Sequence, residues 1–363
     1  MITNVIKNSS INTKVHAKMR GTLNNADYDR LVNMRSVPEA AEYLKNNTRF
    51  AEIFRGIDVE NIHRGQLEAR LHMLMTRDLK SFLAFSGTSA KFFLSLFAIK
   101  DEIVYLKILL RLIMSDSPPG FAGTYRFEGD FYNDIDFTAL ANAKDFDTFA
   151  NMLSGTVYGK VFHSFIGHPK RQNLFELENA LDLFYRNLVF NYMSKYSSKD
   201  EKGFAEKTFG AETDIDNIML IVRAKKYYGM TADMIYPYIC TKSYRLKKEE
   251  LQSIAEAASE QGMMDAIGKT YYARLFSGGL EKGGRRSCGL KNAESRISVY
   301  TLELHSRMFH KNPYSIESIL YFIKLKQIEI KNIIMIIEGI RYGIEPETIK
   351  GYLIGVTRSQ KWE

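Results

Sequence analysis

The sequence has 363 residues, of which 45% are hydrophobic and 25% charged, the balance of a soluble globular protein with two or three domain-sized units. Its net charge of +8 is a moderate excess that is spread along the chain, and no nucleic-acid-binding motif accompanies it, so the charge does not single out nucleic acid as a partner. The N-terminus is polar and no apolar run approaches the ~20 residues that span a bilayer, so we expect neither a signal peptide nor a transmembrane helix.

Apolar residues recur at helical spacing along the chain, whereas the alternation that is typical of strands is hard to find. Proline is scarce as well, with seven residues in all. The sequence therefore predicts an all-α protein. Two clear examples of the helical spacing are Ile103, Leu106, Leu109, Leu110 and Ile113, and Leu181, Phe184, Tyr185 and Leu188.

One seven-residue pattern occurs three times, at 48–54, 156–162 and 270–276. Each copy reads threonine, any residue, an aromatic residue, a small residue, a charged residue, a branched aliphatic residue and phenylalanine. We interpret the aromatic residues as core side chains of three similar units, although contacts to a partner are the alternative. These residues are Phe50, Tyr158, Tyr272, Phe54, Phe162 and Phe276.

Two more patterns recur in the same order, and all steps between copies are 108 to 116 residues. The first begins at Glu68, Glu178 and Glu294. The other spans 102–111, 214–223 and 329–338, where an acidic residue opens an apolar helix. Three patterns in one order indicate a threefold internal repeat.

We expect unit boundaries at 117–120 and near 241–245, which gives helical repeats 1–119, 120–243 and 244–363. Three such units in series could close around an axis with pseudo-threefold symmetry. That arrangement suggests a socket or a ring-like adaptor rather than an active-site cleft.

A search for reactive groups gives little. Cys240 and Cys288 are far apart and are expected to be reduced thiols, and the seven histidines fit no zinc motif. The glycine-rich stretch 277–289 lacks the Lys-Ser/Thr of a phosphate-binding loop, so we interpret it as a basic surface loop. Asp130, Asp134 and Asp136 are interpreted as a solvated acidic turn rather than a cation site. We therefore expect no catalytic residue, no metal and no cofactor.

The C-terminal third carries the most specific pattern in the sequence. It comprises Met308 to Ile316, Tyr321-Phe322, Glu329 to Ile333 and Arg341 to Ile349, and it resembles the C-terminal signature of the C subunit of V-type (archaeal-type) rotary ATPases, which is called d in eukaryotes. The N-terminal stretches Ala17 to Arg20, Tyr28 to Leu31 and Ser36 to Ala41 are similar to the opening of that family. The resemblance covers essentially the full length and is weakest around 121–147.

The resemblance implies a funnel of helices and a non-catalytic subunit on the cytoplasmic face of the membrane. Proteins of this family couple the central rotor shaft to the membrane ring that carries protons or sodium ions, while the nucleotides bind to other subunits. The partners would be the shaft subunits and the rotor ring, with no nucleic acid and no small-molecule substrate. This sequence departs from the family at Glu338, where a basic residue is usual, and at Ile333-Ile334.

Three equivalent positions are candidates for the shaft interface: Arg111, Arg223 and Glu338. One interpretation places them at the solvated end of each helix. The other has them face a central concavity, where the change of sign at Glu338 suits an asymmetric shaft. Two rival functions stay open, namely a basic helical scaffold that binds nucleic acid or another protein, and a helical enzyme with a dispersed site.

Overall fold

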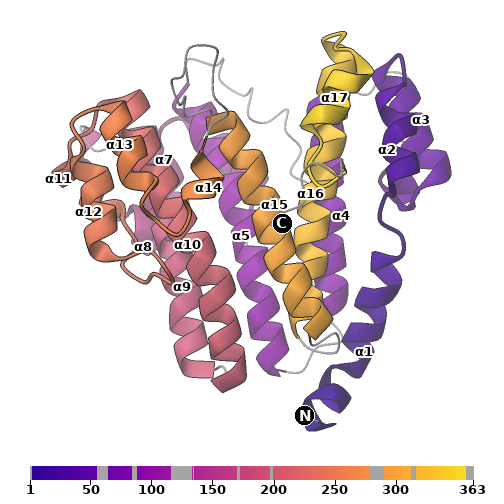
Figure 1. The fold of residues 1–363 in the computed structure, drawn as a ribbon, viewed down its shortest axis with the longest axis horizontal. Helices are drawn as coiled ribbons and strands as arrows, with labels where there is room; N and C mark the ends of the chain where they lie inside the picture. Colours follow the sequence, from indigo (N-terminus) through magenta and orange to yellow (C-terminus); the bar gives the residue numbers. More distant parts are fainter. Residues whose placement is uncertain are drawn as a thin grey trace. The chain divides into compact units, whose positions relative to one another are not determined.

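The computed structural model describes residues 2–54, 64–83, 88–115, 133, 135–169, 172–196, 199–277, 290–311 and 316–356. All regular elements within these ranges are helices, which confirms the all-α prediction (Figure 1). The helices are α1 (Ile2–Met19), α2 (Asn25–Val32), α3 (Val37–Asn47), the 3-10 helix η1 (Arg49–Phe54), α4 (Arg64–Leu83), α5 (Thr88–Ile113), α6 (Phe137–Leu140), α7 (Phe146–Met152), α8 (Gly159–Phe162), α9 (Leu174–Tyr196), α10 (Lys199–Tyr228), α11 (Ala232–Ile235), the 3-10 helix η4 (Tyr236–Tyr238), α12 (Lys248–Glu256), α13 (Glu260–Ile267), α14 (Ala273–Phe276), α15 (Leu290–Lys311), α16 (Ile316–Arg341) and α17 (Pro346–Tyr352).

The order of helix types repeats along the chain. Three helices of 4–11 residues are followed by two long helices from α2 to α5 (which includes η1), from α6 to α10 and from α12 to α16. A capping side chain opens the second helix of each series, because Ser36, Asp145 and Ser259 accept hydrogen bonds from the first free backbone N–H groups. This order supports the three predicted copies, and their arrangement around an axis stays a prediction.

The threonine of the seven-residue pattern makes the same two kinds of hydrogen bond in all three places. Thr48 Oγ1 donates to the carbonyl of Leu44 and accepts from the Phe50 N–H. Thr156 and Thr270 make the equivalent pair of bonds. The aromatic residues of the pattern are at most 1% exposed, which confirms that they belong to the core: Phe50, Tyr158, Tyr272, Phe54, Phe162 and Phe276.

The chain divides into two compact units, and the first contains residues 1–182 and 306–361. In it α4 packs against both α5 and α16 (Figure 1), and α1 packs along α16. One core joins the two ends of the chain, because side chains of α2, α3, η1 and α4 pack against α16 and α17. Its members from the C-terminal end are Ile330, Ile333, Ile336, Ile337, Ile349 and Leu353.

The second unit contains residues 183–305. Within it α12 and α13 pack against each other and against α10, while α11 contacts α12 and α13 contacts α14. Buried residues of these helices include Ile218, Ile221, Ile254 and Ile267, each 0% exposed. None of the helices in the described part of the chain is both long and apolar enough to cross a membrane.

Two long helices end in the same way. Gly229 after α10 and Gly343 after α16 have φ values of 59° and 63°, a left-handed conformation that favours glycine. Two asparagines also fix the chain that follows these helices. Asn217 on α10 and Asn332 on α16 lie three residues after the acidic residue of the repeated pattern, and each side-chain amide bonds both the N–H and the C=O of a single residue beyond its own helix. These residues are Cys240, at 2.8 and 3.1 Å, and Ile354, at 3.0 and 2.8 Å.

Several sequence expectations fall outside the described residues. They concern the boundary at 117–120, Asp130, Asp134, Cys288 and residues 278–289 of the glycine-rich stretch. Asp136 is described, and its Oδ1 accepts a bond from Ala139 N at the start of α6. Cys240 is a buried free thiol.

Candidate functional site

The first candidate residue, Arg111, lies in the last turn of α5. Its Nε and Nη2 donate to the two carboxylate oxygens of Glu178 on α9, at 2.6 and 2.9 Å. This two-pronged geometry fixes the plane of the guanidinium group. Because the Arg111 side chain is 57% exposed, water screens the pair, and we expect about 0.2–1 kcal/mol of stabilisation from it.

Arg223 on α10 repeats that arrangement in the second unit. Its Nη2 donates to Oε1 of Glu294 on α15 at 2.6 Å, and both side chains are about half exposed. Glu338 on α16 is half-buried, between the buried Ile337 and Gly339. Arg111 and Glu338 belong to the first unit and Arg223 to the second.

The two arginines are thus paired within the chain, and their partners belong to the second repeated pattern. The sequence predicts both patterns, but it does not predict that the arginines of one pattern pair with the glutamates of the other. The opposite charges of Arg111 and Arg223 in one column and of the glutamates in the other could have revealed the contact. In the first copy the glutamate is Glu68, whose side chain lies outside the described residues.

The acidic residue at the start of the third repeated pattern lies near the middle of each long helix and is buried, which the sequence did not predict. Glu102 on α5 is 1% exposed. Its Oε1 accepts from the Asn133 N–H at 2.7 Å, and its Oε2 accepts from Asn133 Nδ2 at 2.6 Å and from the Tyr158 hydroxyl at 2.7 Å. Residue 133 lies just before α6, so the carboxylate of one copy holds the segment that begins the next.

Asp214 on α10 does the same in the second unit, with 0% exposure. Its Oδ2 accepts from the backbone N–H groups of Arg245 and Leu246 at 2.7 and 3.0 Å and from the Tyr272 hydroxyl at 2.9 Å. Its Oδ1 accepts from Tyr244 N at 3.1 Å. These donors satisfy a charge whose burial alone would be costly.

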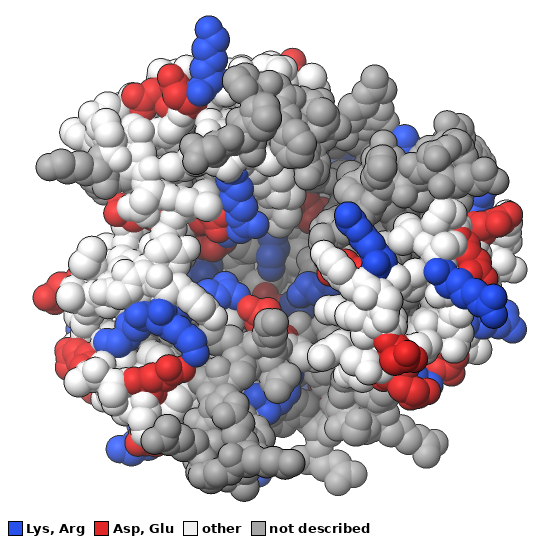
Figure 2. All heavy atoms as spheres, turned by 90° about the horizontal axis from the view of Figure 1, so that it is seen from above, with Lys and Arg blue, Asp and Glu red and all other residues white. Residues whose placement is uncertain are grey.

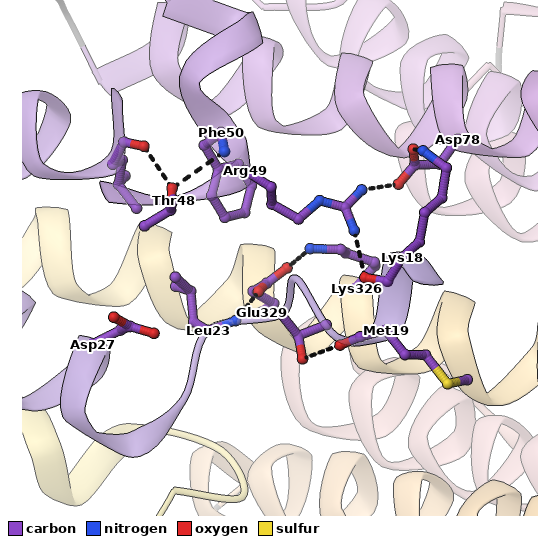
Figure 3. A network of polar contacts seen from close by, with 12 residues as sticks. Lys18, Met19, Leu23, Asp27, Thr48, Arg49, Phe50, Asp78, Lys326 and Glu329 are labelled. Carbon is purple, nitrogen blue, oxygen red and sulfur yellow. Dashed lines mark hydrogen bonds and ion pairs between the residues drawn. The ribbon is translucent and has the colours of Figure 1, made fainter. Parts of the chain in front are cut away.

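Glu329 on α16 is the third buried acid, with 2% exposure. Its Oε1 accepts from the Leu23 N–H at 2.6 Å, just before α2, and its Oε2 pairs with Lys326 (Figure 3). Nearby on α4, Asp78 forms ion pairs with both Lys18 and Arg49. Buried carboxylates therefore fasten segments that are remote in sequence, and in this case the two ends of the chain.

Burial changes the titration of the two tyrosines in a direction that keeps them hydrogen-bond donors. Burial raises the pKa of Tyr158 and of Tyr272, and the adjacent carboxylates raise both further. Both hydroxyls therefore remain protonated donors at neutral pH. Burial also raises the pKa of Asp214, although the hydrogen bonds from Arg245, Tyr272 and the neighbouring backbone act against that shift.

Asp101, beside Glu102, is different because its Oδ2 is buried and has no hydrogen-bond partner among the described residues. Burial raises the pKa of Asp101 to about 8, and the charge of Glu102 adds to the rise while Lys100 opposes it. Within the described ranges, no three or more His, Cys, Asp or Glu side chains gather in a way that could hold a metal ion. The arrangement is suited to holding helices in place.

Comparison with known proteins places the chain in a family. A profile of the family described as "ATP synthase (C/AC39) subunit" matches residues 11–352. The chain belongs to this family. The match covers all three repeated patterns and confirms the resemblance to the C subunit of archaeal-type ATPases.

Members of the family in methanogenic archaea are similar over nearly the whole length. The C subunit of the A-type ATP synthase of Methanocaldococcus jannaschii is 23% identical over 365 residues, which cover 98% of this chain and 88% of that protein. The C subunit of the A-type ATP synthase of Methanosarcina mazei is 26% identical over 350 residues, which cover 94% of this chain and 91% of that protein.

Proposed function

We propose that the chain is a non-catalytic subunit of the central stalk of a V-type or archaeal-type rotary ATPase. In this role it couples the rotor shaft to the membrane ring that carries protons or sodium ions, at the cytoplasmic face of the membrane. Catalysis then takes place on other subunits. The observation that carries the proposal is the family match over residues 11–352, together with relatives that are named as the C subunit of A-type ATP synthases.

The packing supports this role in physical terms. A part that transmits torque needs rigid helices more than it needs a reactive group. The longest helices, α5, α10 and α16, have 26, 30 and 26 residues. Each is fixed by a buried carboxylate to backbone or side-chain donors of a remote segment. Rotation of such a helix would break several charge-assisted bonds at once, so the anchors resist twisting.

The charge distribution gives less support to a scaffold for nucleic acid. On the face drawn in Figure 2, basic side chains lie next to acidic ones in several places. Arg111, Arg223, Lys107 and Lys226 all form ion pairs with carboxylates of their own chain. Cations that are already paired contribute less to counterion release from a nucleic acid.

We also propose Arg111, Arg223 and Glu338 as residues of the shaft interface. All three stand at the same position of the repeated pattern, and two are at least half exposed. Arg111 is held by two bonds to Glu178 and Arg223 by one bond to Glu294, and both arginine side chains stay at least half exposed to a partner. Glu338 presents the opposite charge, which would distinguish one side of an asymmetric shaft from the other two.

A capture experiment tests the proposed function. The tagged full-length chain is mixed with purified shaft subunits and, separately, with the detergent-solubilised rotor ring, in a series of salt concentrations. We expect capture of the shaft subunits and of the ring at physiological salt. Capture of nucleic acid with a steep dependence on salt, and of neither ATPase component, would overturn the proposal.

A further inference from the structure

The three buried carboxylates are not held in the same way. In two copies the acid accepts a hydrogen bond from a tyrosine hydroxyl, from Tyr158 at Glu102 and from Tyr272 at Asp214. The residue at the tyrosine position in the remaining case is Phe50, which has no hydroxyl. The acid near it is Glu329, on the helix from the other end of the chain.

Lys326 takes the place of the missing hydroxyl. It lies one turn before Glu329 on α16, is 1% exposed, and pairs with the Glu329 carboxylate. Its Nζ also lies over the ring of Phe50, 4.9 Å from the centroid. At the same register, three residues before the acid, the other two long helices have Ile99 and Ala211, which are buried and uncharged.

The two differences therefore occur together. Where the facing aromatic residue is tyrosine, the helix has an aliphatic residue three positions before its acid, and where it is phenylalanine the helix has lysine. A tyrosine hydroxyl and a lysine ammonium would compete for the same carboxylate oxygen. An acid with neither would lose its charge-assisted donor in a buried site, which is costly.

Lys326 lies within a cluster of charged side chains from four elements. Figure 3 shows Lys18 from α1, Arg49 from η1, Asp78 from α4 and Glu329 from α16 gathered around it. Asp78 forms ion pairs with Lys18 and Arg49, and the Arg49 guanidinium donates to the Lys18 carbonyl at 2.9 Å. Burial lowers the pKa of Lys326, and the charges of Arg49 and Lys18 lower it further while Asp78 opposes them.

We propose that Lys326 and Phe50 are a coupled replacement for the tyrosine and aliphatic residue of the other two copies, and that they form a lysine clasp which fastens the α1–α2 turn to α16. The clasp consists of Lys326, Glu329, Phe50 and the Leu23 N–H. It joins the two ends of the chain beside their shared hydrophobic core, because Leu23 belongs to the N-terminal segment and Glu329 to the C-terminal helix. The clasp uses a lysine side chain of the long helix itself, whereas a tyrosine hydroxyl from the facing segment serves in the other two copies.

Four full-length proteins test the coupling: the wild type, Phe50→Tyr, Lys326→Ile and the double variant. The readout is hydrogen exchange of the Leu23 amide, which donates directly to Glu329, with the amides of residues 244–246 as an internal reference. We expect each single change to speed exchange at Leu23 by about tenfold or more, a loss of about 1.4 kcal/mol of local stability. The double variant should return to within about threefold of the wild type, because the new hydroxyl then reaches Glu329 unopposed.

Lys331→Ile is the matched control, since Lys331 lies on the same helix and is exposed. It should leave exchange at Leu23 unchanged. If a single variant fails to fold, the reverse exchange gives the same test, with Tyr158→Phe compared with Tyr158→Phe/Ile99→Lys at the Asn133 amide. The proposal would be overturned if the double variant changed the exchange rate by the product of the two single effects. It would also be overturned if the single changes left the exchange rate as in the wild type.

Discussion

Replacement of Asp214 by asparagine is the sharpest test of the buried anchors. The change keeps the shape of the side chain and exchanges one carboxylate oxygen for an NH2 group. With the amide nitrogen in the Oδ2 position, a donor would face the N–H groups of Arg245 and Leu246, which lie 2.7 and 3.0 Å from the present oxygen. If the amide turns over, its nitrogen takes the Oδ1 position and faces the Tyr244 N–H, which at present donates to both carboxylate oxygens.

In the first orientation the N–H groups of Arg245 and Leu246 lose their acceptor, and in the second the Tyr244 N–H keeps only its longer bond to Oδ2, at 3.2 Å, and faces a donor. An unsatisfied buried donor costs about 1–3 kcal/mol, and the loss of charge-assisted bonds adds to it. We expect Asp214→Asn to lower the free energy of unfolding by about 2–4 kcal/mol, a large part of the ~5–15 kcal/mol that is typical of a folded protein. Urea unfolding followed by circular dichroism measures the loss, and hydrogen exchange at residues 244–246 locates it.

The matched control is Asp216→Asn, two residues along the same helix. The Asp216 side chain is 55% exposed and lies 3.7 Å from Arg186. The same chemical change should cost less than about 1 kcal/mol there, as for other exposed ion pairs. Equal losses in the two variants would refute the idea that Asp214 anchors the segment before α12.

Three further changes test other features of the structure. The pKa of Asp101 is raised to about 8 from ~3.9 in the unfolded chain. Its contribution to stability is therefore complete below about pH 4 and is lost as the pH rises to 8. Asp101→Asn should stabilise the protein at pH 8 more than at pH 5 in urea unfolding, and an equal effect at both pH values would count against this. Tyr272→Phe removes a hydroxyl bond to a buried carboxylate and should cost about 1.5–3 kcal/mol, whereas Tyr271→Phe, at a side chain that is 60% exposed, should change the unfolding midpoint little. Arg223→Glu should weaken shaft binding and make it more sensitive to salt. The charge-swapped double variant Arg223→Glu/Glu294→Arg restores the internal ion pair. Recovery of shaft binding in that variant would show that Arg223 acts only within its own chain.

The helices and much of the core could be predicted from the sequence, because both follow from local periodicity. The Thr-x-aromatic turn is an example, since Thr156 and Tyr158 are two residues apart and the bond between them is local. The packing of α16 against the N-terminal helices could not be predicted in this way. Periodicity tells which face of the Ile330–Ile337 stretch is apolar, but not which distant segment covers that face.

The buried acids were missed for a related reason. Glu102, Asp214 and Glu329 occupy the same position of the repeated pattern. In a sequence, an acidic residue beside an apolar run is as typical of a solvated position as of a buried one. Only the tertiary structure shows the backbone donors that make burial tolerable. The coupled difference at Phe50 and Lys326 can be recognised in the sequence only after the structure shows that these two positions are in contact.

In the proposed role, this chain joins two other parts of a rotary ATPase. Reconstitution tests that role with the rotor ring in nanodiscs, the purified shaft subunits and the untagged full-length chain, and co-sedimentation of the shaft is the readout. We expect the shaft to sediment with the ring only when the chain is present, in proportion to the chain added. Equal sedimentation of the shaft with and without the chain would contradict the proposed role.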